Sequence, residues 1–258
     1  MSHSNQVTQE FLDSAQYATE SILQYEKIYG EDFVSPGGHQ ITFELVGQMK
    51  LSPGSRVLDA GCGLGGSAFV MARDFNLIVD GIDLSKNMLA IANDKLAAHG
   101  LSERVSFKWR DCLELDRPEY YDAIYSRDVF LHIEDKSRLF TVLNAALRPG
   151  GRLLFTDYCC GEKPWSDAFS DYVDDRGYIL HTLPDYAELI SKAGFEQVEY
   201  QDITDRFIGI LQCDLDKITT LDLAHSERTK LEQAWRHKLT RTEAGDQRWG
   251  LFRAIRGG

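Results

Sequence analysis

Two side chains suited to proton transfer stand close together in the segment RDVFLHI, residues 127–133. Asp128 and His132 are four residues apart, so on a helical turn both would point the same way. A carboxylate can hold an ammonium group while an imidazole takes its proton. An isolated histidine is more often a structural residue. This one follows a strand predicted at 121–126, at the edge where doubly wound sheets bind ligands, so we expect Asp128 and His132 to act on an amine.

A second set of side chains is suited to an anion. Tyr172 and Arg176 are four residues apart, Tyr178 follows closely, and Tyr158 ends a predicted strand. A planar guanidinium matches phosphate oxygens and phenols add neutral donors, while aromatic faces favour a cationic amine. Ordinary structural roles also fit this pattern, because tyrosines at helical spacing often belong to a core and Arg176 could pair with a neighbouring aspartate.

A glycine-rich turn supplies a third signal. In RVLDAGCGLGG, residues 56–66, an apolar run is followed by four glycines within six residues. Glycine permits positive φ and a close approach of the backbone to a ligand. The spacing of Gly61, Gly63 and Gly66 also fits a dinucleotide fingerprint, so the turn alone does not separate a nicotinamide cofactor from S-adenosylmethionine.

Acidic residues end the two strands predicted after this turn. Asp83 closes LIVDGID, about twenty residues beyond the turn, where such an acid accepts hydrogen bonds from ribose hydroxyls, and Asp111 closes VSFKWRD. With Asp59 in the first strand, these acids resemble those of class I S-adenosylmethionine-dependent methyltransferases. The resemblance implies that Asp59 lies near the amino-acid part of the cofactor and Asp111 near the adenine. It also implies an α/β fold with a Rossmann-like seven-stranded sheet, N-terminal lid helices and an inserted substrate-binding helical segment.

Apolar periodicity predicts the elements that position these residues. Helical spacing at 7–29 and 34–49 predicts N-terminal helices that can close over the ligand edge as a lid. Ser85 is the expected N-cap of the helix after the second strand and Gly100 its stop. Later in the chain we expect a helix at 183–194 and strands at 197–203 and 248–255.

Length, charge and cysteine content limit the class of protein. The 258 residues fit a single methyltransferase domain, 1–258, with lid helices at 1–50, a cofactor-binding half at 51–160 and a substrate-binding half at 161–258. A net charge of −12 argues against nucleic acid as a partner. No apolar run approaches the ~20 residues that cross a bilayer, and no signal peptide is recognisable, so we expect a cytoplasmic protein without membrane insertion. Five cysteines without a C-x-x-C pair favour neither disulfides nor zinc, and we expect a metal-independent monomer.

Several longer segments carry a more specific resemblance. They are AQYATESILQYEKIYGEDFVSPGG, YSRDVFLHI, TDYCCGEK, DYVDDRGY and the terminal QRWG. These segments resemble the phosphoethanolamine N-methyltransferases of Plasmodium, plants and nematodes. The similarity runs from about residue 11 to the C-terminus and is closest to the single-domain parasite type.

This resemblance implies a set of site residues. Tyr17 would form a latch with His132 over the active site, and Asp128 would be the third catalytic residue. The substrate-binding residues would be Gln16 and Tyr25 near the amine, and Tyr158, Tyr172, Arg176, Tyr178 and Lys238 around the phosphate. The cofactor-binding residues would be Val34, Ser35, Gly61, Gly63, Asp83, Leu84, Asp111, Cys112 and Arg127. Lys238 is assigned to the phosphate residues mainly from its distance in sequence before QRWG, because residues 204–234 align poorly with the family.

The implied activity is methyl transfer from S-adenosylmethionine to the nitrogen of phosphoethanolamine or its mono- and dimethyl forms, toward phosphocholine and phospholipid metabolism. Direct displacement requires an amine with a free lone pair, so an ammonium must first lose a proton. Two other functions stay open: N-methylation of another small molecule, such as a glycine-type or natural-product amine, and non-catalytic binding of S-adenosylmethionine. The first would not require the tyrosine and arginine cluster, and the second would need neither Asp128 nor His132. An oxidoreductase is less favoured, since no hydride-transfer site is recognisable.

Overall fold

A seven-stranded sheet forms the centre of the protein, whose computed structural model describes residues 19–258. The strands are β1 (Arg56–Ala60), β2 (Ile78–Asp83), β3 (Val105–Trp109), β4 (Tyr121–Arg127), β5 (Leu147–Cys160), β6 (Phe195–Asp202) and β7 (Gln247–Arg256). Their order is β3-β2-β1-β4-β5-β7-β6, with β1 to β5 parallel and β7 antiparallel to both neighbours. The sheet therefore has the predicted α/β arrangement.

Helices cover both faces of this sheet. The helices are α2 (Thr19–Tyr29), α3 (Gly38–Gln48), α4 (Gly66–Asp74), α5 (Lys86–His99), α6 (Lys136–Ala146), α7 (Asp167–Arg176), α8 (Leu183–Lys192), α9 (Thr204–Thr220) and α10 (His225–Glu243). Buried side chains of α3 and α4 share one apolar cluster with the strands, and those of α6 and α8 share another on the opposite face. Removal of these side chains from water stabilises the three-layer arrangement.

Local capping explains why the predicted helix after β2 forms. The Ser85 hydroxyl accepts a hydrogen bond from the Met88 amide at 3.2 Å, and Gly100 ends α5 with φ of 66°. A side-chain acceptor at the N-cap and a left-handed glycine after the last turn are the usual ends of a helix. Both predicted boundaries of this helix are confirmed.

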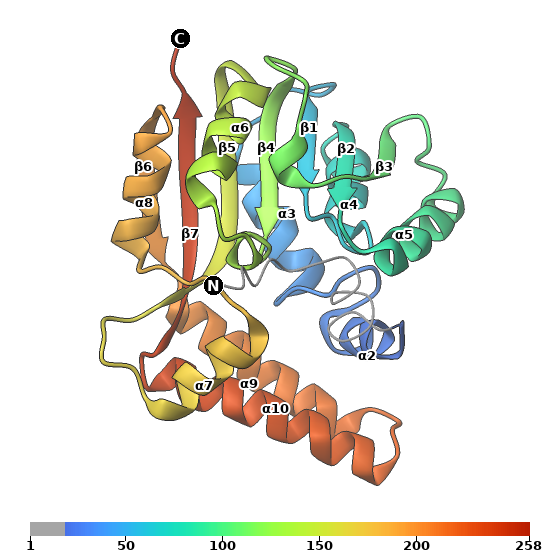
Figure 1. Cartoon of the computed structure of the whole chain (residues 1–258). Coiled ribbons are helices and arrows are strands. Elements are labelled where there is room, and N and C mark those ends of the chain that lie inside the picture. The colour runs from blue at the N-terminus through green and yellow to red at the C-terminus, as the bar shows by residue number, and fades with distance from the viewer. Residues whose placement is uncertain (1–18) are drawn as a thin grey trace, which may run out of the picture.

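The carboxyl ends of β1 to β5 face a layer of helices. Figure 1 shows the parallel strands pointing toward α2, α7, α9 and α10, with α9 and α10 forming a long antiparallel pair beyond this edge. The segment 204–234, for which no element was expected, forms α9 and much of α10. Phe207, Leu211 and Ile218 are buried on α9 at spacings of four and seven residues. That helical period was present in the sequence and could have been found.

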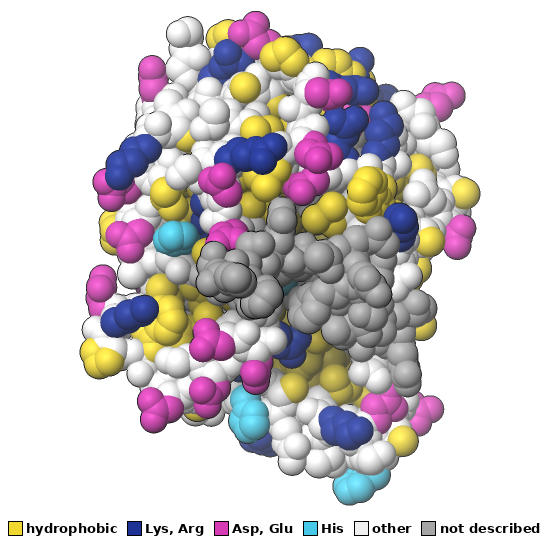
Figure 2. Space-filling model, viewed as in Figure 1, with side chains coloured by type: hydrophobic (Ala, Val, Ile, Leu, Met, Phe, Trp, Pro, Cys, Tyr) yellow, Lys and Arg dark blue, Asp and Glu magenta, His cyan; other side chains and the backbone are white. Residues whose placement is uncertain are grey.

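The surface shows no dominant charge pattern on the face in Figure 2, where acidic and basic side chains are interspersed. Within residues 19–258, no helix combines the length and apolar character needed to cross a membrane. The same part of the chain holds no group of three or more His, Cys, Asp or Glu side chains arranged for a metal ion.

Candidate active site

One large cavity of about 730 Å³ lies at the carboxyl edge of the sheet. It is lined by all the predicted site residues that the structure describes. These are Tyr25, Val34, Ser35, Gly61, Gly63, Asp83, Leu84, Asp111, Cys112, Arg127, Asp128, His132, Tyr158, Tyr172, Arg176, Tyr178 and Lys238. The predicted residues Gln16 and Tyr17 lie outside the described part of the chain. The structure thus brings the described set together, while the role of each residue stays a prediction.

The glycine turn after β1 requires glycine for both conformation and space. Gly61 has φ of 77°, and a Cβ there would lie 2.3 Å from the side chain of Val129. Gly63 has φ of 53°, and its amide donates to Asp83 Oδ2 at 2.9 Å. Left-handed backbone is costly for other residues, so a side chain here would displace the turn from the cavity.

The carboxylates at the ends of β2 and β3 are held by backbone amides. Asp83 Oδ1 accepts from the Ser85 amide at 2.8 Å, in addition to its bond from Gly63. Asp111 Oδ1 accepts from the Leu113 amide at 2.8 Å. Both side chains are therefore fixed in orientation at the cavity wall.

Asp59 differs from Asp83 and Asp111 because it does not line the cavity. It was expected near the amino-acid part of the cofactor, but it lies within β1, is only 2% exposed and does not line the cavity. Its position pairs with Gly81 on one side and Tyr125 on the other, inside the sheet. Burial, with the charge of Asp83 added, raises the pKa of Asp59 to about 7.

Arg127 connects the end of β4 to the segment before α3. Its guanidinium donates to Thr156 Oγ1 at 3.0 Å, to Thr42 Oγ1 at 3.2 Å and to the Pro36 carbonyl at 2.6 Å. Residues 34–35, which line the cavity, directly precede that carbonyl. Arg127 is thus placed to hold this wall of the cavity in position.

Asp128 has one carboxylate oxygen that accepts no hydrogen bond from the described residues. Its Oδ1 accepts from Trp249 Nε1 at 2.7 Å and from Thr156 Oγ1 at 3.0 Å. Its buried Oδ2 has no hydrogen-bond partner among the described residues, although the Arg127 guanidinium lies 3.9 Å away. A buried acceptor without a hydrogen bond at a cavity wall is costly unless a ligand supplies a donor. An ammonium group would supply one.

The expectation that Asp128 and His132 share a helical turn is wrong. Asp128 has φ of 56° and precedes a short 3₁₀ turn, η3, formed by Phe130–His132. Its amide donates to the Thr156 carbonyl at 2.8 Å, so a contact with β5 overrides the local helical spacing. The two side chains nevertheless line the same cavity.

His132 carries an imidazole that is neutral near neutral pH. Burial, together with the charges of Lys136 and Arg176, lowers its pKa to about 4. Its Nδ1 is enclosed and has no hydrogen-bond partner among residues 19–258. Its ring lies edge-on to Tyr178 at 5.2 Å between centroids. A neutral ring has a lone pair that can accept a proton.

Phenols and a guanidinium gather at the other end of the cavity. Tyr158 is buried at the end of β5, while Tyr172 and Arg176 lie on α7 one turn apart, as predicted. Tyr178 follows the left-handed Gly177 that ends α7, and its ring lies 5.7 Å from that of Tyr172. The Arg176 guanidinium lies 5.9 Å from the Tyr172 ring centre.

Helix α10 adds side chains to this end, including three that the sequence analysis missed or placed only by offset. Lys238 Nζ lies 3.4 Å from Tyr29 Oη and 4.7 Å from the ring centre of Trp235. Burial and the charge of Arg241 lower the pKa of Lys238 to about 7. Trp235, Lys238 and Arg241 recur at intervals of three residues, a helical spacing that marks one face. That spacing could have indicated from the sequence that the three side chains share one face of a helix. For Tyr29 the sequence offered only its place in an apolar helical pattern.

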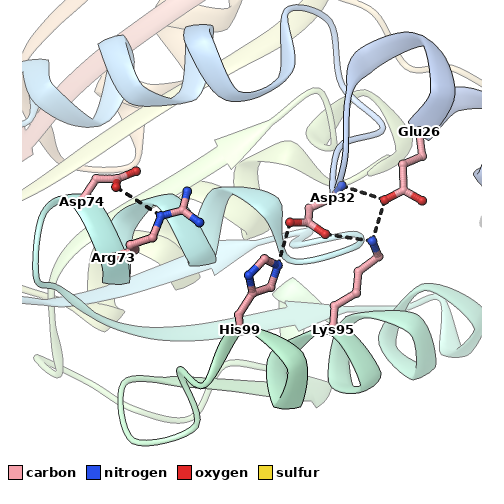
Figure 3. A network of polar contacts seen from close by, with 6 residues as sticks. All are labelled: Glu26, Asp32, Arg73, Asp74, Lys95 and His99. Carbon is pink, nitrogen blue, oxygen red and sulfur yellow. Dashed lines mark hydrogen bonds and ion pairs between the residues drawn. The ribbon is translucent and has the colours of Figure 1, made fainter.

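The helix before the cavity is anchored to the cofactor half by a polar network (Figure 3). Lys95 Nζ on α5 lies 2.6 Å from Glu26 Oε1 on α2 and 2.8 Å from Asp32 Oδ1. His99 Nε2 lies 2.9 Å from Asp32 Oδ2, and the Asp32 amide donates to Glu26 Oε1 at 2.7 Å. These contacts hold α2, which carries the cavity residues Tyr25 and Tyr29, against α5.

The fold and the cavity define a class I methyltransferase. A family model described as a methyltransferase domain matches residues 51–226 of the chain. A cavity bounded by a glycine turn and strand-end carboxylates at the carboxyl edge of a seven-stranded sheet agrees with that match. The predicted fold class is confirmed.

More specific relatives identify the family. Phosphoethanolamine N-methyltransferase 3 of Arabidopsis thaliana is 43% identical over 96% of this chain and 52% of the plant protein. Phosphoethanolamine N-methyltransferase of Plasmodium falciparum is 34% identical over 95% of each chain. A solved structure of Haemonchus contortus phosphoethanolamine N-methyltransferase 2 has a TM-score of 0.93 at 34% identity, covering 98% of this chain and 61% of that one. The chain belongs to the phosphoethanolamine N-methyltransferase family, as its segments predicted, and spans about half the length of its plant relatives. The expected closer likeness to the parasite type holds for length but not for identity, which is 43% with the Arabidopsis protein and 34% with the Plasmodium protein.

Proposed function

We propose that this chain transfers a methyl group from S-adenosylmethionine to the nitrogen of phosphoethanolamine or its N-methylated forms. One observation carries the proposal: a single cavity joins a glycine turn and two strand-end carboxylates to a cluster of phenols and cations. Asp128 and His132 follow β4, which lies between β1 and β5 in the sheet. An amine held there would lie between a donor site and a phosphate site.

The relatives support the substrate class. The Plasmodium relative, matched over 95% of its length, is named for phosphoethanolamine N-methylation. The Haemonchus structure is a complex with phosphomonomethylethanolamine and S-adenosylhomocysteine. A glycine-type methyltransferase would keep the donor end but would not need Tyr158, Tyr172, Arg176 and Tyr178 in one cavity.

The donor end fits S-adenosylmethionine. The carboxylates of Asp83 and Asp111 line the cavity and are held by backbone amides, which suits them to ribose hydroxyls and an adenine amine. When bound, S-adenosylmethionine supplies an electrophilic methyl group on a sulfonium. Val34, Ser35 and Arg127 would complete this end of the site.

The amine is held and deprotonated by residues of the chain itself. Asp128 Oδ2 accepts a hydrogen bond from the substrate nitrogen, while Trp249 and Thr156 fix the other oxygen. His132 takes the proton that blocks the nitrogen lone pair. A phosphate dianion beside Arg176 would offset one of the charges that lower the pKa of His132. The family resemblance also assigns a latch between Tyr17 and His132.

We further propose that the chain works as a cytoplasmic monomer and that its product enters phosphocholine synthesis and phospholipid metabolism. Light scattering after gel filtration measures the oligomeric state, and a stable dimer would contradict the proposed monomer.

The proposed activity is tested with three substrates. The protein is incubated with S-adenosylmethionine and separately with phosphoethanolamine, its monomethyl form and its dimethyl form, and the products are resolved by mass. At least one phosphobase should gain 14 Da per transfer, the mass of one CH₂, as expected for a proton replaced by a methyl group. Each transfer should release one S-adenosylhomocysteine. Absence of product from all three would overturn the proposed function.

A further inference from the structure

A second arginine stands in the cavity beside the predicted phosphate residues. Arg241 lies near the end of α10, and its guanidinium carbon is 3.8 Å from the ring centre of Tyr172. This contact is closer than the 5.9 Å between Arg176 and the same ring. Arg241 is also half-buried, whereas Arg176 is exposed. Stacking on an aromatic face fixes the plane of a guanidinium without using its hydrogens.

One nitrogen of Arg241 has a structural partner. Its Nε donates to Gln247 Oε1 at 2.5 Å, which ties α10 to the start of β7. Within residues 19–258 no hydrogen bond is formed by either terminal nitrogen, and no carboxylate forms an ion pair with this side chain. The two terminal nitrogens of the Arg241 guanidinium can therefore donate hydrogen bonds to a ligand.

Arg241 lies close to other cations. Its electrostatic neighbours are three phenols, of Tyr158, Tyr172 and Tyr178, and the cation Arg176. The pKa of Lys238 is lowered by burial and then by Arg241. Asp214 and Asp128 are the acids that act on Lys238, but each already accepts from a tryptophan indole. The positive charges of Lys238 and Arg241 therefore oppose each other, and an anion bound between them would relieve that repulsion.

We propose that Arg241 is a further phosphate-binding residue and that it makes the site selective for a doubly charged phosphomonoester. This inference rests on the proposed function and deepens it. Tyr172 orients the guanidinium, Gln247 anchors its Nε, and the terminal nitrogens donate to phosphate oxygens. A phosphodiester has one charge fewer and one bridging oxygen more, so it gains less from a second guanidinium.

The variants Arg241→Gln and Arg241→Lys test this assignment. Arg236→Gln is the matched control, because Arg236 lies on the same helix, is exposed and does not line the cavity. Phosphoethanolamine is titrated calorimetrically into each protein saturated with S-adenosylhomocysteine. Loss of charged hydrogen bonds in Arg241→Gln should weaken phosphoethanolamine binding roughly 10- to 100-fold. Arg241→Lys should recover part of this loss, and Arg236→Gln should change binding less than twofold.

A second readout separates phosphate recognition from a structural role. The O-methyl phosphodiester of phosphoethanolamine is titrated into the same proteins, and wild type should prefer the monoester. This preference should shrink in Arg241→Gln, while affinity for S-adenosylhomocysteine and the melting temperature stay close to those of wild type. Unchanged monoester affinity in Arg241→Gln would overturn the assignment. Equal losses for monoester, diester and S-adenosylhomocysteine would show that Arg241 only tethers α10 to β7.

The proposed function is judged by wild type in the same experiment. Wild-type protein that methylates phosphoethanolamine upholds it, whatever the Arg241 variants do. Wild-type protein that neither binds nor methylates any phosphobase would overturn both the proposed function and the role of Arg241.

Discussion

The two ends of the cavity are built in different ways. At the donor end, the lining residues Gly61, Gly63, Asp83 and Asp111 come from the ends of three strands that follow one another along the chain. At the phosphate end, they come from β5, α7 and α10, with Tyr29 from α2. The donor end depends on sheet topology and backbone amides, whereas the phosphate end depends on packing between distant helices. Changes at one end should therefore leave binding at the other nearly intact.

The largest effect is expected where the two ends meet. His132→Ala removes the proposed proton acceptor, and general base assistance contributes about 10²–10⁴-fold to a rate. The single-turnover rate should fall by that order, while affinities for S-adenosylmethionine and for the phosphobase change little. Exposed His225 provides the control, His225→Ala. A single-turnover rate within threefold of wild type would remove His132 as the base.

The latch assigned by the family resemblance can be tested with the same assay. Residues that act as one unit give non-additive losses. Tyr17→Phe, His132→Ala and the double variant should therefore lose similar amounts of kcat. Strictly additive losses would contradict the latch, even if each residue proved important alone.

A change in the glycine turn should affect the donor end alone. Gly61→Ala places a methyl group 2.3 Å from Val129 at φ of 77°, which costs about 2–4 kcal/mol in strain and overpacking. Calorimetry should show S-adenosylmethionine binding weakened at least tenfold. Gly209→Ala is the matched control, because Gly209 lies in α9 and a Cβ there meets nothing within 4 Å. Equal donor affinity in Gly61→Ala and wild type would contradict the structural account of the turn.

The pH dependence should appear at the phosphate end. The pKa of Lys238 is lowered to about 7, so its ammonium is charged below that pH and loses its charge above it. The second pKa of a phosphate is about 6, so the substrate gains no further charge in the alkaline range. KM for the phosphobase should therefore rise roughly tenfold between pH 7 and pH 9 as a charged hydrogen bond is lost. The rise should be absent from Lys238→Met, and a rise of equal size in that variant would assign the titration to another group.

The smallest effects come from two tryptophans, one that holds Asp128 between the two ends and one at the donor end. Trp249→Phe keeps an aromatic ring but removes the bond from Nε1 to Asp128 Oδ1, a loss of about 0.5–1.5 kcal/mol. KM for the phosphobase should rise threefold to tenfold. Trp109→Phe removes the bond from Nε1 to the Leu84 carbonyl at the donor end, where the ring is exposed, and should shift only donor affinity, by less than threefold. Steady-state kinetics with each substrate varied in turn measures the effect of both variants. A change in donor affinity in Trp249→Phe, or in KM for the phosphobase in Trp109→Phe, would contradict the division of the cavity.

This division also explains what the sequence could predict. At the donor end, Asp83 and Asp111 each follow an apolar run, so chain order alone gives their common edge. Asp59 does not reach the cavity wall because β1 continues one residue further, to Ala60, and keeps Asp59 inside the sheet. The helical turn expected at Asp128 fails because contacts with Thr156 and Trp249 fix its backbone and side chain.

At the phosphate end, the sequence indicated which side chains share one side of a helix but not which other elements that side contacts. The spacing of Tyr172 and Arg176 correctly predicted a shared side of α7. Lys238 was predicted to line the cavity from the family resemblance and not from a local sequence pattern. Arg241 was missed because its importance comes from stacking on Tyr172, which lies on a different helix and is brought near only by tertiary packing.

The central claim is that the phenols and cations of this end bind phosphate. The most direct test compares methylation of phosphoethanolamine and of free ethanolamine by the same protein, with the Arg176→Lys variant in parallel. We expect kcat/KM for ethanolamine to be lower by at least two orders of magnitude, since about 3 kcal/mol of charged hydrogen bonds is lost. Arg176→Lys should raise KM for phosphoethanolamine without changing donor affinity, because lysine lacks the bidentate fork. Comparable kcat/KM values for ethanolamine and phosphoethanolamine would contradict the phosphate site and the proposed substrate class with it.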